Sequence, residues 1–478
     1  MMKVQLSEHI NHVEPLVKSL VKELSERFDG VSVLATDCQG KKLAVGFSGT
    51  SVDDGMLAER GFVARVYNGT GYSEHSFNEL TEGNLNNLVQ KISTTAKKDL
   101  AAMQAAGIET SALPAPTAYG KTETFEADVK VLPSSVSTAD KIQRMAEIME
   151  DGKAYCDQLI DFKVIYNDLT ICKAFYTKDS VSKQAYTFAT ANALALVAKD
   201  GNMQYEYGGV SGNKGVEVLD ELKDVTHKII DDAVELLSAE RVAPGTYEVI
   251  CDPQVTGLIA HEAFGHGVEM DMFVKERAKG AEYIDKYVAS EILDMHDGAT
   301  SAENVASFLF DDEGVFGTDT KIIENGVLKA GISDLLSAVR LGTPPTGNGR
   351  RETFERKAYA RMTNTFFAPG KDKLSDMIAS IKHGYLLENY KSGMEDPKNW
   401  GIQCMISKGR EIKDGKLTGK IVAPVLMTGY VPDVLKSITA VSDGELSLYG
   451  GGHCGKGYKE WMKTSIGGTY IKLTGRLG

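Results

Sequence analysis

Apolar residues near the N-terminus recur at intervals of three and four positions, and this spacing predicts an amphipathic helix. Such intervals place side chains on one face of a helix. Ser7 stands where an N-cap is expected. The helix should therefore pack on a core through the stripe formed by Leu6, Ile10, Val13, Val17, Leu20, Val21 and Leu24.

After this helix the pattern changes to short β-rich runs separated by Gly and Asp. Between Gly30 and Glu79 the runs VSVLATD, KKLAVGFSG and GFVARVYNG predict an antiparallel meander. Helical periodicity returns over residues 85–105, 137–157 and 216–239, with strands expected near 158–210. The first half of the chain thus predicts an α+β region, an antiparallel sheet backed by helices.

Short strands and glycine turns dominate the second half. IENGVLK and EIKDGKL place Asn-Gly and Asp-Gly between strand-like arms, a strong local signal for a β-hairpin. One helix is expected among these strands, because Asp252 can cap it and Pro253 suits its first position. Overall we expect an α+β protein whose C-terminal region is β-rich and mostly antiparallel.

The length of 478 residues exceeds what one hydrophobic core usually organises, so more than one domain is expected. The phrase RVAPGTYEVICDP marks the main boundary and gives domains 1–240 and 241–478. The Pro- and Ala-rich stretch ALPAPTAYG suggests subdomains 1–112 and 113–240 within the first.

Composition and charge indicate which class of partner and which cellular compartment to expect. A net charge of -13 argues against nucleic acid, which is bound through Lys and Arg. The six cysteines are scattered, which suggests a reducing compartment rather than a disulfide framework. The N-terminus lacks the apolar core of a signal peptide, and no segment approaches the roughly 20 apolar residues of a membrane span. We expect a cytoplasmic protein.

The candidate chemistry lies on the predicted helix of the second half, in HEAFGH. His261, Glu262 and His266 bring two imidazoles and a carboxylate together, and these groups suit zinc and the activation of water. Histidines four apart lie about 40° apart around an α-helix, whereas histidines five apart lie about 140° apart. Convergence on one ion therefore needs a widened π-type turn, or a helix that ends before His266.

A third ligand is required, and the sequence leaves its identity open. Cys454, in the glycine-rich GGGHCGKG, is the best candidate, because a thiolate binds zinc and glycines permit close backbone approach. The alternative is a buried free thiol without a role, which is the commoner fate of a lone cysteine. His453, Glu269 and Asp271 are rival ligands. Arg350, Arg351 and Arg361 could bind a substrate carboxylate or form ordinary charge pairs on a loop.

Several ordered blocks carry a resemblance to a known family. HEAFGH, DDEGVFGTDTKIIENGVLKAG, TPPTGNGRRE, RMTNTFFAPG and CGKG occur in this order. In these blocks the chain resembles the TldD/PmbA family of metallopeptidases, also described as modulators of DNA gyrase, in which HEAFGH corresponds to an HExxxH motif. One departure follows Cys454, where TldD-like chains usually continue CGK-x-GQ and this chain reads CGKGYKEW.

The resemblance implies a specific site and activity. It assigns His261, His266 and Cys454 to Zn²⁺ and Glu262 to the catalytic base. PmbA-like subunits lack these ligands, so this chain resembles the active TldD-like type. The implied substrate is a peptide or unfolded polypeptide, and the implied assembly is a homodimer or a heterodimer with a PmbA-like subunit.

Two hypotheses of different classes follow. In the first, the chain is a zinc peptidase in which Glu262 activates water. In the second, it is a non-catalytic peptide-binding or regulatory subunit of a dimer with a structural metal. Structural zinc sites are closed by four protein ligands, whereas catalytic sites keep one position open. A fourth ligand beside His261, His266 and Cys454 would favour the second hypothesis.

Overall fold

The computed structural model describes residues 1–69, 71–108, 121–456 and 460–478. In its first half, each stretch of helical periodicity forms a long helix. Ser7 caps the first, accepting a hydrogen bond from the Ile10 N–H. The helices predicted from periodicity are therefore confirmed as α1 (Glu8–Ser25), α2 (Leu85–Ala105), α3 (Thr138–Tyr155) and α4 (Val218–Leu236).

The described strands of the first half form a nine-stranded, mainly antiparallel sheet, besides a short β1–β8 pair (Met2–Lys3 with Asp128–Val129). The strands of the large sheet are β2 (Gly30–Gln39), β3 (Lys41–Gly46), β4 (Gly49–Asp54), β5 (Glu59–Tyr67), β6 (Tyr72–Phe77), β7 (Glu123–Glu126), β9 (Leu159–Thr177), β10 (Val181–Lys199) and β11 (Asn202–Gly212).

The simple meander predicted between Gly30 and Glu79 is wrong. Strand β2 pairs with β5 rather than with its neighbour β3. The reason is the 19-residue strand β9, which pairs with β2 near one end and with β3 near the other. A partner more than a hundred residues away leaves no mark on the local alternation of β2 and β3, so the pattern predicts strands but not their order.

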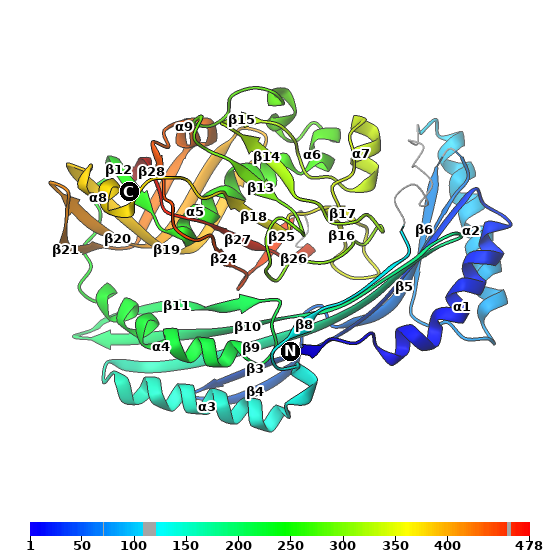
Figure 1. Cartoon of the computed structure of the whole chain (residues 1–478), viewed down its shortest axis with the longest axis horizontal. Coiled ribbons are helices and arrows are strands. Elements are labelled where there is room, and N and C mark those ends of the chain that lie inside the picture. The colour runs from blue at the N-terminus through cyan, green and yellow to red at the C-terminus, as the bar shows by residue number, and fades with distance from the viewer. Residues whose placement is uncertain (70, 109–120, 457–459) are drawn as a thin grey trace.

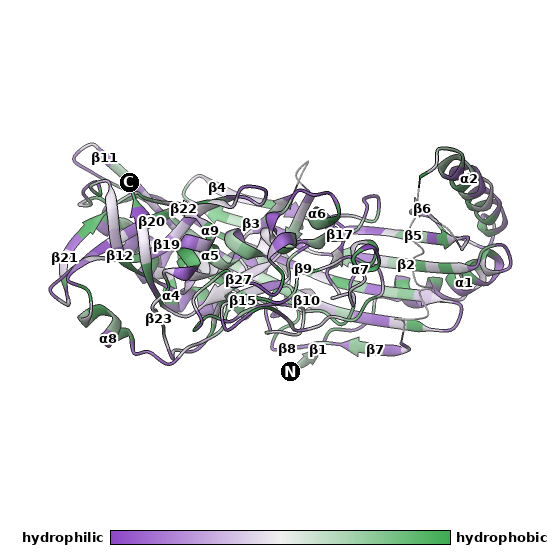
Figure 2. Ribbon diagram, turned by 90° about the horizontal axis from the view of Figure 1, so that it is seen from above, coloured by the Kyte–Doolittle hydropathy of each residue, from purple (hydrophilic) through white to green (hydrophobic). Residues whose placement is uncertain are grey.

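Separate apolar cores lie at the two ends of this long sheet. Helices α1 and α2 contribute to one core and α3 and α4 to the other. Figure 1 shows α1 and α2 far from α3 and α4, and Figure 2 shows α1 and α2 grouped at one end of the elongated molecule. Near the middle, Phe308 and Phe310 of the second half pack against the sheet.

Two further sheets build the second half. The seven-stranded sheet has the order β12-β19-β20-β22-β28-β23, with β21 on β20. Its strands are β12 (Gly245–Cys251), β19 (His383–Asp396), β20 (Gly401–Lys413), β21 (Lys416–Val422), β22 (Val425–Tyr430), β23 (Ala440–Val441) and β28 (Ile471–Leu477).

The six-stranded sheet has the order β15-β14-β13-β18-β27-β24, and short β16–β17 and β25–β26 pairs accompany it. These strands are β13 (Met295–Asp297), β14 (Thr320–Glu324), β15 (Val327–Leu328), β16 (Gly349–Arg350), β17 (Tyr359–Ala360), β18 (Asn364–Phe367), β24 (Ser447–Tyr449), β25 (His453–Lys456), β26 (Glu460–Lys463) and β27 (Ser465–Gly468). The α+β class and the mostly antiparallel C-terminal region are thus confirmed.

Both hairpins predicted from Asn-Gly and Asp-Gly are present. Asn325 and Gly326 join β14 to β15, and Asp414 and Gly415 join β20 to β21. All four residues have positive φ, which the two-residue turn that fits the twist of a hairpin requires.

The predicted helix of the second half is α5 (Pro253–Ala260), in which Asp252 accepts a hydrogen bond from the Val255 N–H and Pro253 occupies the first turn. It contacts strands of both sheets, including β19 and β27. The expectation of a single helix here is wrong, because α6 (Met270–Val274), α7 (Leu335–Leu341), α8 (Leu374–Ala379) and α9 (Val431–Lys436) are also present. Each spans only five to seven residues, too few to show a helical period.

The predicted domain boundary between residues 240 and 241 falls between α4 and β12, and it stays a prediction. Charge pairs cross it: Lys408 of β20, with no exposed side-chain surface, lies 2.7 Å from Asp232 and 2.5 Å from Glu235 of α4. The proposed connector, residues 112–120, lies outside the described residues. Within the described part of the chain, no helix combines the length and apolar character needed to cross a bilayer.

We predict that Gly257→Ala destabilises the protein. A Cβ at Gly257 would lie 2.4 Å from the backbone nitrogen of Gly467 in β27, so helix and strand would have to separate. Overpacking of this kind costs about 1–3 kcal/mol. Urea denaturation should show a lower midpoint with an unchanged slope. Gly401→Ala is the control, because a Cβ there meets no atom within 4 Å; equal midpoints for the two variants would contradict the prediction.

Candidate metal centre

The helix that carries HEAFGH changes its winding at the motif. After α5, residues His261–Gly265 form a π-helix, and His266–Val268 form a 3-10 turn. The His266 N–H donates to the His261 carbonyl, so residues five apart are one turn apart. The two imidazole centroids lie 5.0 Å apart at an interplanar angle of 82°. Of the two geometries that the five-residue spacing allowed, the widened π-type turn is the one present.

Cys454 comes to these histidines on β25. Its Sγ lies 3.1 Å from His266 Nε2. One ligand atom from each of His261, His266 and Cys454 forms a group within 4.8 Å, and all three residues are buried or nearly so. The residues after Cys454 that depart from the TldD-like pattern include 457–459, which lie outside the described residues.

The Cys454 thiol and the His266 imidazole shift each other's pKa in opposite directions. Burial alone would raise the pKa of Cys454, but His266 and His261 hold it well below its usual value. Burial alone would lower the pKa of His266, but Cys454 and then Glu269 raise it well above its usual value. The site therefore favours a thiolate, the form of cysteine that binds metal.

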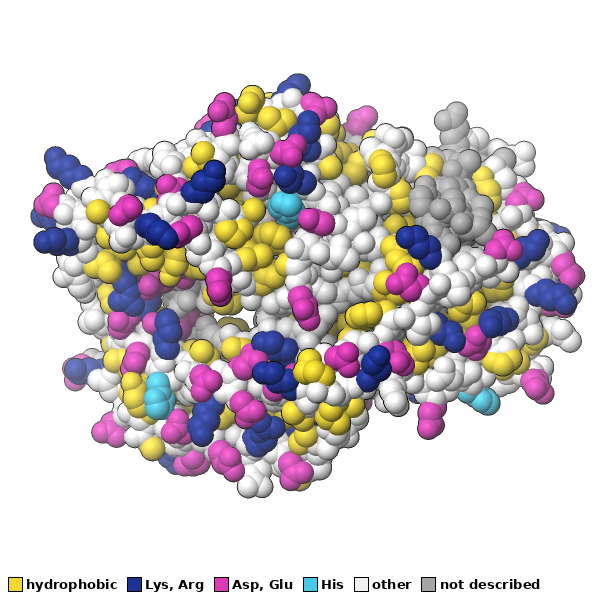
Figure 3. All heavy atoms as spheres, viewed as in Figure 1, with side chains coloured by type: hydrophobic (Ala, Val, Ile, Leu, Met, Phe, Trp, Pro, Cys, Tyr) yellow, Lys and Arg dark blue, Asp and Glu magenta, His cyan; other side chains and the backbone are white. Residues whose placement is uncertain are grey.

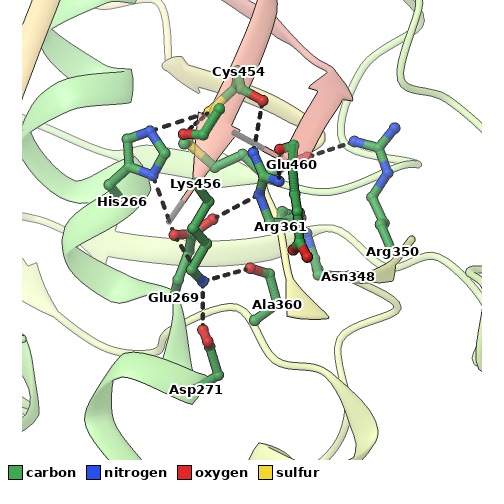
Figure 4. A network of polar contacts seen from close by, with 12 residues as sticks. His266, Glu269, Asp271, Asn348, Arg350, Ala360, Arg361, Cys454, Lys456 and Glu460 are labelled. Atoms are coloured by element: carbon green, nitrogen blue, oxygen red, sulfur yellow. Dashed lines mark hydrogen bonds and ion pairs between the residues drawn. The ribbon is translucent and has the colours of Figure 1, made fainter. Parts of the chain in front are cut away.

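A charged network behind the histidine fixes its orientation (Figure 4). Glu269 Oε2 lies 3.1 Å from His266 Nδ1, which leaves Nε2 directed at Cys454. Lys456 Nζ lies 3.1 Å from Glu269 Oε2 and 2.6 Å from Asp271 Oδ1. Although burial would raise the pKa of Glu269, Lys456 and His266 hold it well below its usual range. Glu269 is thus an ionised partner of His266.

Arg361 holds the β25–β26 hairpin against this network. Its side chain is 1% exposed, and it donates to the Cys454 carbonyl at 2.8 Å and to the Glu460 carbonyl at 2.7 Å. Its Nε also lies 3.5 Å from Glu269 Oε1. Because Arg361 contacts both strands of the hairpin and Glu269, it couples the position of Cys454 to that of His266.

The three grouped residues open onto a cavity of about 540 Å³. Glu262 lines it and is 8% exposed. Strand β19 forms another wall, with Tyr390, Gly393 and Glu395. A Cβ at Gly393 would lie 2.7 Å from Glu262 Oε1, so the strand passes close to this carboxylate. Burial, and then Glu262, raises the pKa of Tyr390 to about 12, which keeps its hydroxyl a hydrogen-bond donor.

The rival ligands lie outside the three-residue group. Glu269 and Asp271 contact His266 and Lys456 as described above. His453 lines the cavity, and burial followed by Lys463 lowers its pKa to about 3. Its Nε2 is buried without a hydrogen-bond partner in the described residues.

The predicted arginines do not lie on a solvated loop. Arg350 donates to the Met362 carbonyl, and Arg351 is buried and pairs with Glu74. Sequence reasoning missed the clamping role of Arg361 and the position of Lys456, although both stand in the family-like blocks RMTNTFFAPG and CGKG. It also missed Tyr390 and Glu395, which no motif singled out.

The donor set fits a metal ion. Two imidazoles and a thiolate are ligands that zinc prefers, and a carboxylate behind a ligating histidine is a common outer partner. His261 Nδ1 is buried and has no hydrogen-bond partner in the described residues. Such a buried polar atom costs free energy unless another group satisfies it, so the geometry is consistent with a ligand at this position.

Comparison with known proteins finds similar sequences among metalloproteases. The family model of the PmbA/TldA metallopeptidase C-terminal domain matches residues 244–474. A metalloprotease of Methanocaldococcus jannaschii is 30% identical over 68% of this chain and 71% of its own length. A zinc metalloprotease TldD homolog of Saccharolobus solfataricus is 26% identical over 70% of this chain and 74% of its own length.

Two solved structures share the whole fold. A modulator of DNA gyrase from Bacteroides thetaiotaomicron has a TM-score of 0.72 and 16% identity, covering 97% of this chain and 99% of the other. TldE from Thermococcus kodakarensis has a TM-score of 0.72 and 14% identity, with the same coverage. The resemblance predicted from the ordered blocks is confirmed, and the chain belongs to the TldD/PmbA family of metallopeptidases.

Proposed function

We propose that this chain is a zinc-dependent peptidase that hydrolyses peptides or unfolded protein segments, with His261, His266 and Cys454 holding the ion. The observation that carries the proposal is the grouping of their ligand atoms within 4.8 Å, at the wall of a cavity that Glu262 also lines. The zinc metalloprotease named among the relatives supports the choice of metal.

When bound, a zinc ion supplies Lewis-acid chemistry that polarises a carbonyl and lowers the pKa of water to about 7. In the proposed mechanism, Glu262 takes a proton from the attacking water on a carboxylate oxygen. The water oxygen bonds to the carbonyl carbon, the carbon–nitrogen bond breaks, and Glu262 returns the proton to the leaving amine. The Tyr390 hydroxyl, also in this cavity, can donate to the oxygen on which negative charge develops.

The proposed substrate binds as an added strand. Strand β12 pairs with β19 only between Gly384 and Leu387. Beyond that point, residues 390–396 pair with β20 on one edge, and no ladder within the described residues occupies the other edge. This stretch lines the cavity. Backbone hydrogen bonds to an added strand require little of its sequence, which suits an unfolded substrate.

The alternative hypothesis, a regulatory subunit with a structural metal, has less support from the geometry. A structural zinc site is closed by four protein ligands. The described residues offer a group of three, and the side chains beside it border an open cavity. We therefore favour catalysis.

We also propose a dimeric assembly in the cytoplasm, either a homodimer or a heterodimer with a PmbA-like subunit. The similarity to TldE supports such a partner. Nucleic acid is not a proposed partner, since the net charge is -13. On the face seen in Figure 3, Lys and Arg side chains are interspersed with Asp and Glu.

The central test is Glu262→Gln. This variant should keep its zinc, because Glu262 lies outside the ligand group. Cleavage of an unfolded peptide should fall roughly 100-fold to 10,000-fold, the range of a lost acid–base group. Zinc content and initial rates are measured on the same sample. Glu445→Gln, at an exposed position, is the matched control. Full activity in zinc-loaded Glu262→Gln protein would exclude Glu262 as the base.

A second test concerns the ligands. Cys454→Ser should lower zinc affinity roughly tenfold or more, because changes even to outer partners of a ligand cost 10- to 100-fold. Metal analysis after dialysis against a graded chelator measures this effect. Cys156→Ser removes a thiol remote from the cavity and should leave zinc content unchanged. Equal zinc content in the two variants would point to another ligand.

A further inference from the structure

Two carboxylates line the proposed catalytic cavity. Glu262 and Glu395 line the cavity, and no Lys or Arg is among its described lining residues. Glu262 is 8% exposed and Glu395 is partly exposed, and no hydrogen bond or ion pair joins either carboxylate to another of the described residues. Buried carboxylates are normally paired. The basic side chains among the described lining residues are histidines, two of which belong to the proposed ligand group.

Glu395 is directed at the cavity by the alternation of β19. Side chains two residues apart lie on the same face of a strand. Gly393 faces Glu262, since a Cβ at Gly393 would meet Glu262 Cγ at 2.6 Å. Glu395, two residues further along, therefore lies on the face turned towards the motif helix. Glu395 also lines an adjoining cavity of about 830 Å³, so it lies where this cavity borders the proposed catalytic cavity.

The surroundings of Glu395 disfavour its ionised form. Burial raises its pKa to about 8, and although His266 opposes this rise, Glu262 and Glu269 add to it. A carboxyl beside a basic side chain shows the opposite shift, as Glu74 does between Arg65 and Arg351. Glu395 does not belong to the group of candidate metal-ligand atoms.

We propose that Glu395 is a specificity-determining residue that binds a cationic group of the substrate next to the bond to be cleaved. The group is an ammonium or guanidinium, supplied either by the free α-amino group of the peptide or by a Lys or Arg side chain. Either source would give the carboxylate the charge-assisted partner that the chain does not provide. This inference rests on the proposed peptidase function, because it assumes that a peptide enters the cavity.

The position of Glu395 fits this role better than a second role in proton transfer. The strand that carries it offers its free edge to the proposed substrate, so a side chain on that strand is well placed to contact a substrate residue. Glu262 already occupies the position beside the ligand group. Glu395 is thus assigned to recognition, and a change there should alter the choice of substrate more than the chemical step.

The test measures peptide binding without cleavage, using zinc-loaded Glu262→Gln protein and labelled peptides followed by fluorescence anisotropy. Four peptides of one sequence carry either Lys or norleucine at one position and either a free or an acetylated N-terminus. Glu262→Gln/Glu395→Gln is compared with Glu262→Gln, and Glu262→Gln/Glu445→Gln is the control. The Lys is placed in turn at each position flanking the cleaved bond.

Removing the Glu395 charge should weaken binding of the recognised peptides roughly tenfold, the value of one charge-assisted hydrogen bond. Weakening for every free N-terminus identifies the α-amino group. Weakening for Lys peptides, acetylated ones included, identifies the side chain. Glu395→Lys should reverse the preference towards a peptide with Glu in place of Lys. The acetylated norleucine peptide should bind both proteins equally.

Equal binding of all four peptides by Glu262→Gln protein would overturn the inference, as would a loss of zinc in the Glu395→Gln variant. The outcome is separable from that of the proposed function. If the peptide preference holds but Glu262→Gln protein still cleaves, the proposed base is wrong while recognition by Glu395 stands. If cleavage depends on Glu262 but no cation preference exists, only the inference fails. Absence of peptide binding would overturn both.

Discussion

The centre depends on one geometric constraint, the convergence of two histidines that are five residues apart. A regular α-helix would turn these imidazoles about 140° away from each other. The π-turn from His261 to Gly265 removes that divergence, and it needs room on its outer side. Gly265 provides this room, since a Cβ there would lie 2.2 Å from the Met362 sulfur. The π-turn therefore packs directly against the segment between β17 and β18. The local change in helical winding is thus tied to how the second half of the chain packs.

The same segment controls the third member of the group. Arg361, next to Met362, bonds both strands of the hairpin that carries Cys454 and pairs with Glu269. A buried thiolate and a buried carboxylate are costly unless cations face them. Lys456 and Arg361 supply those cations beside Glu269, while the imidazoles face the thiolate. The network thus stabilises the ionised donors and fixes their positions through the same contacts.

Local features of the fold were predictable from sequence because they depend on neighbours along the chain. Ser7 and Asp252 act as caps within three residues, and the Asn325-Gly326 turn needs only its own backbone angles. Strand order was not predictable, since β2 and β3 both pair with the distant β9. At the site, spacing alone required either a widened turn at His261–His266 or a helix that ends before His266, whereas the pairing with Cys454 rested on resemblance. Arg361 lies behind the centre and is recognisable only once the hairpin and Glu269 are seen together.

In the proposed function, the residues that hold the metal and those that face the substrate come from different elements, which explains why the motifs show the former and not the latter. The ligand group comes from a helix and a hairpin whose residues are constrained by burial, charge pairing and close backbone contact. Tyr390 and Glu395 come instead from a strand that meets the cavity with one edge. A side chain on this strand must point to the correct face and must not clash with Glu262. Position 393, where a Cβ would meet Glu262, is accordingly a glycine. Under the proposed function, a substitution at Glu395 can therefore alter which peptide is accepted while the residues that pack around His261, His266 and Cys454 stay unchanged.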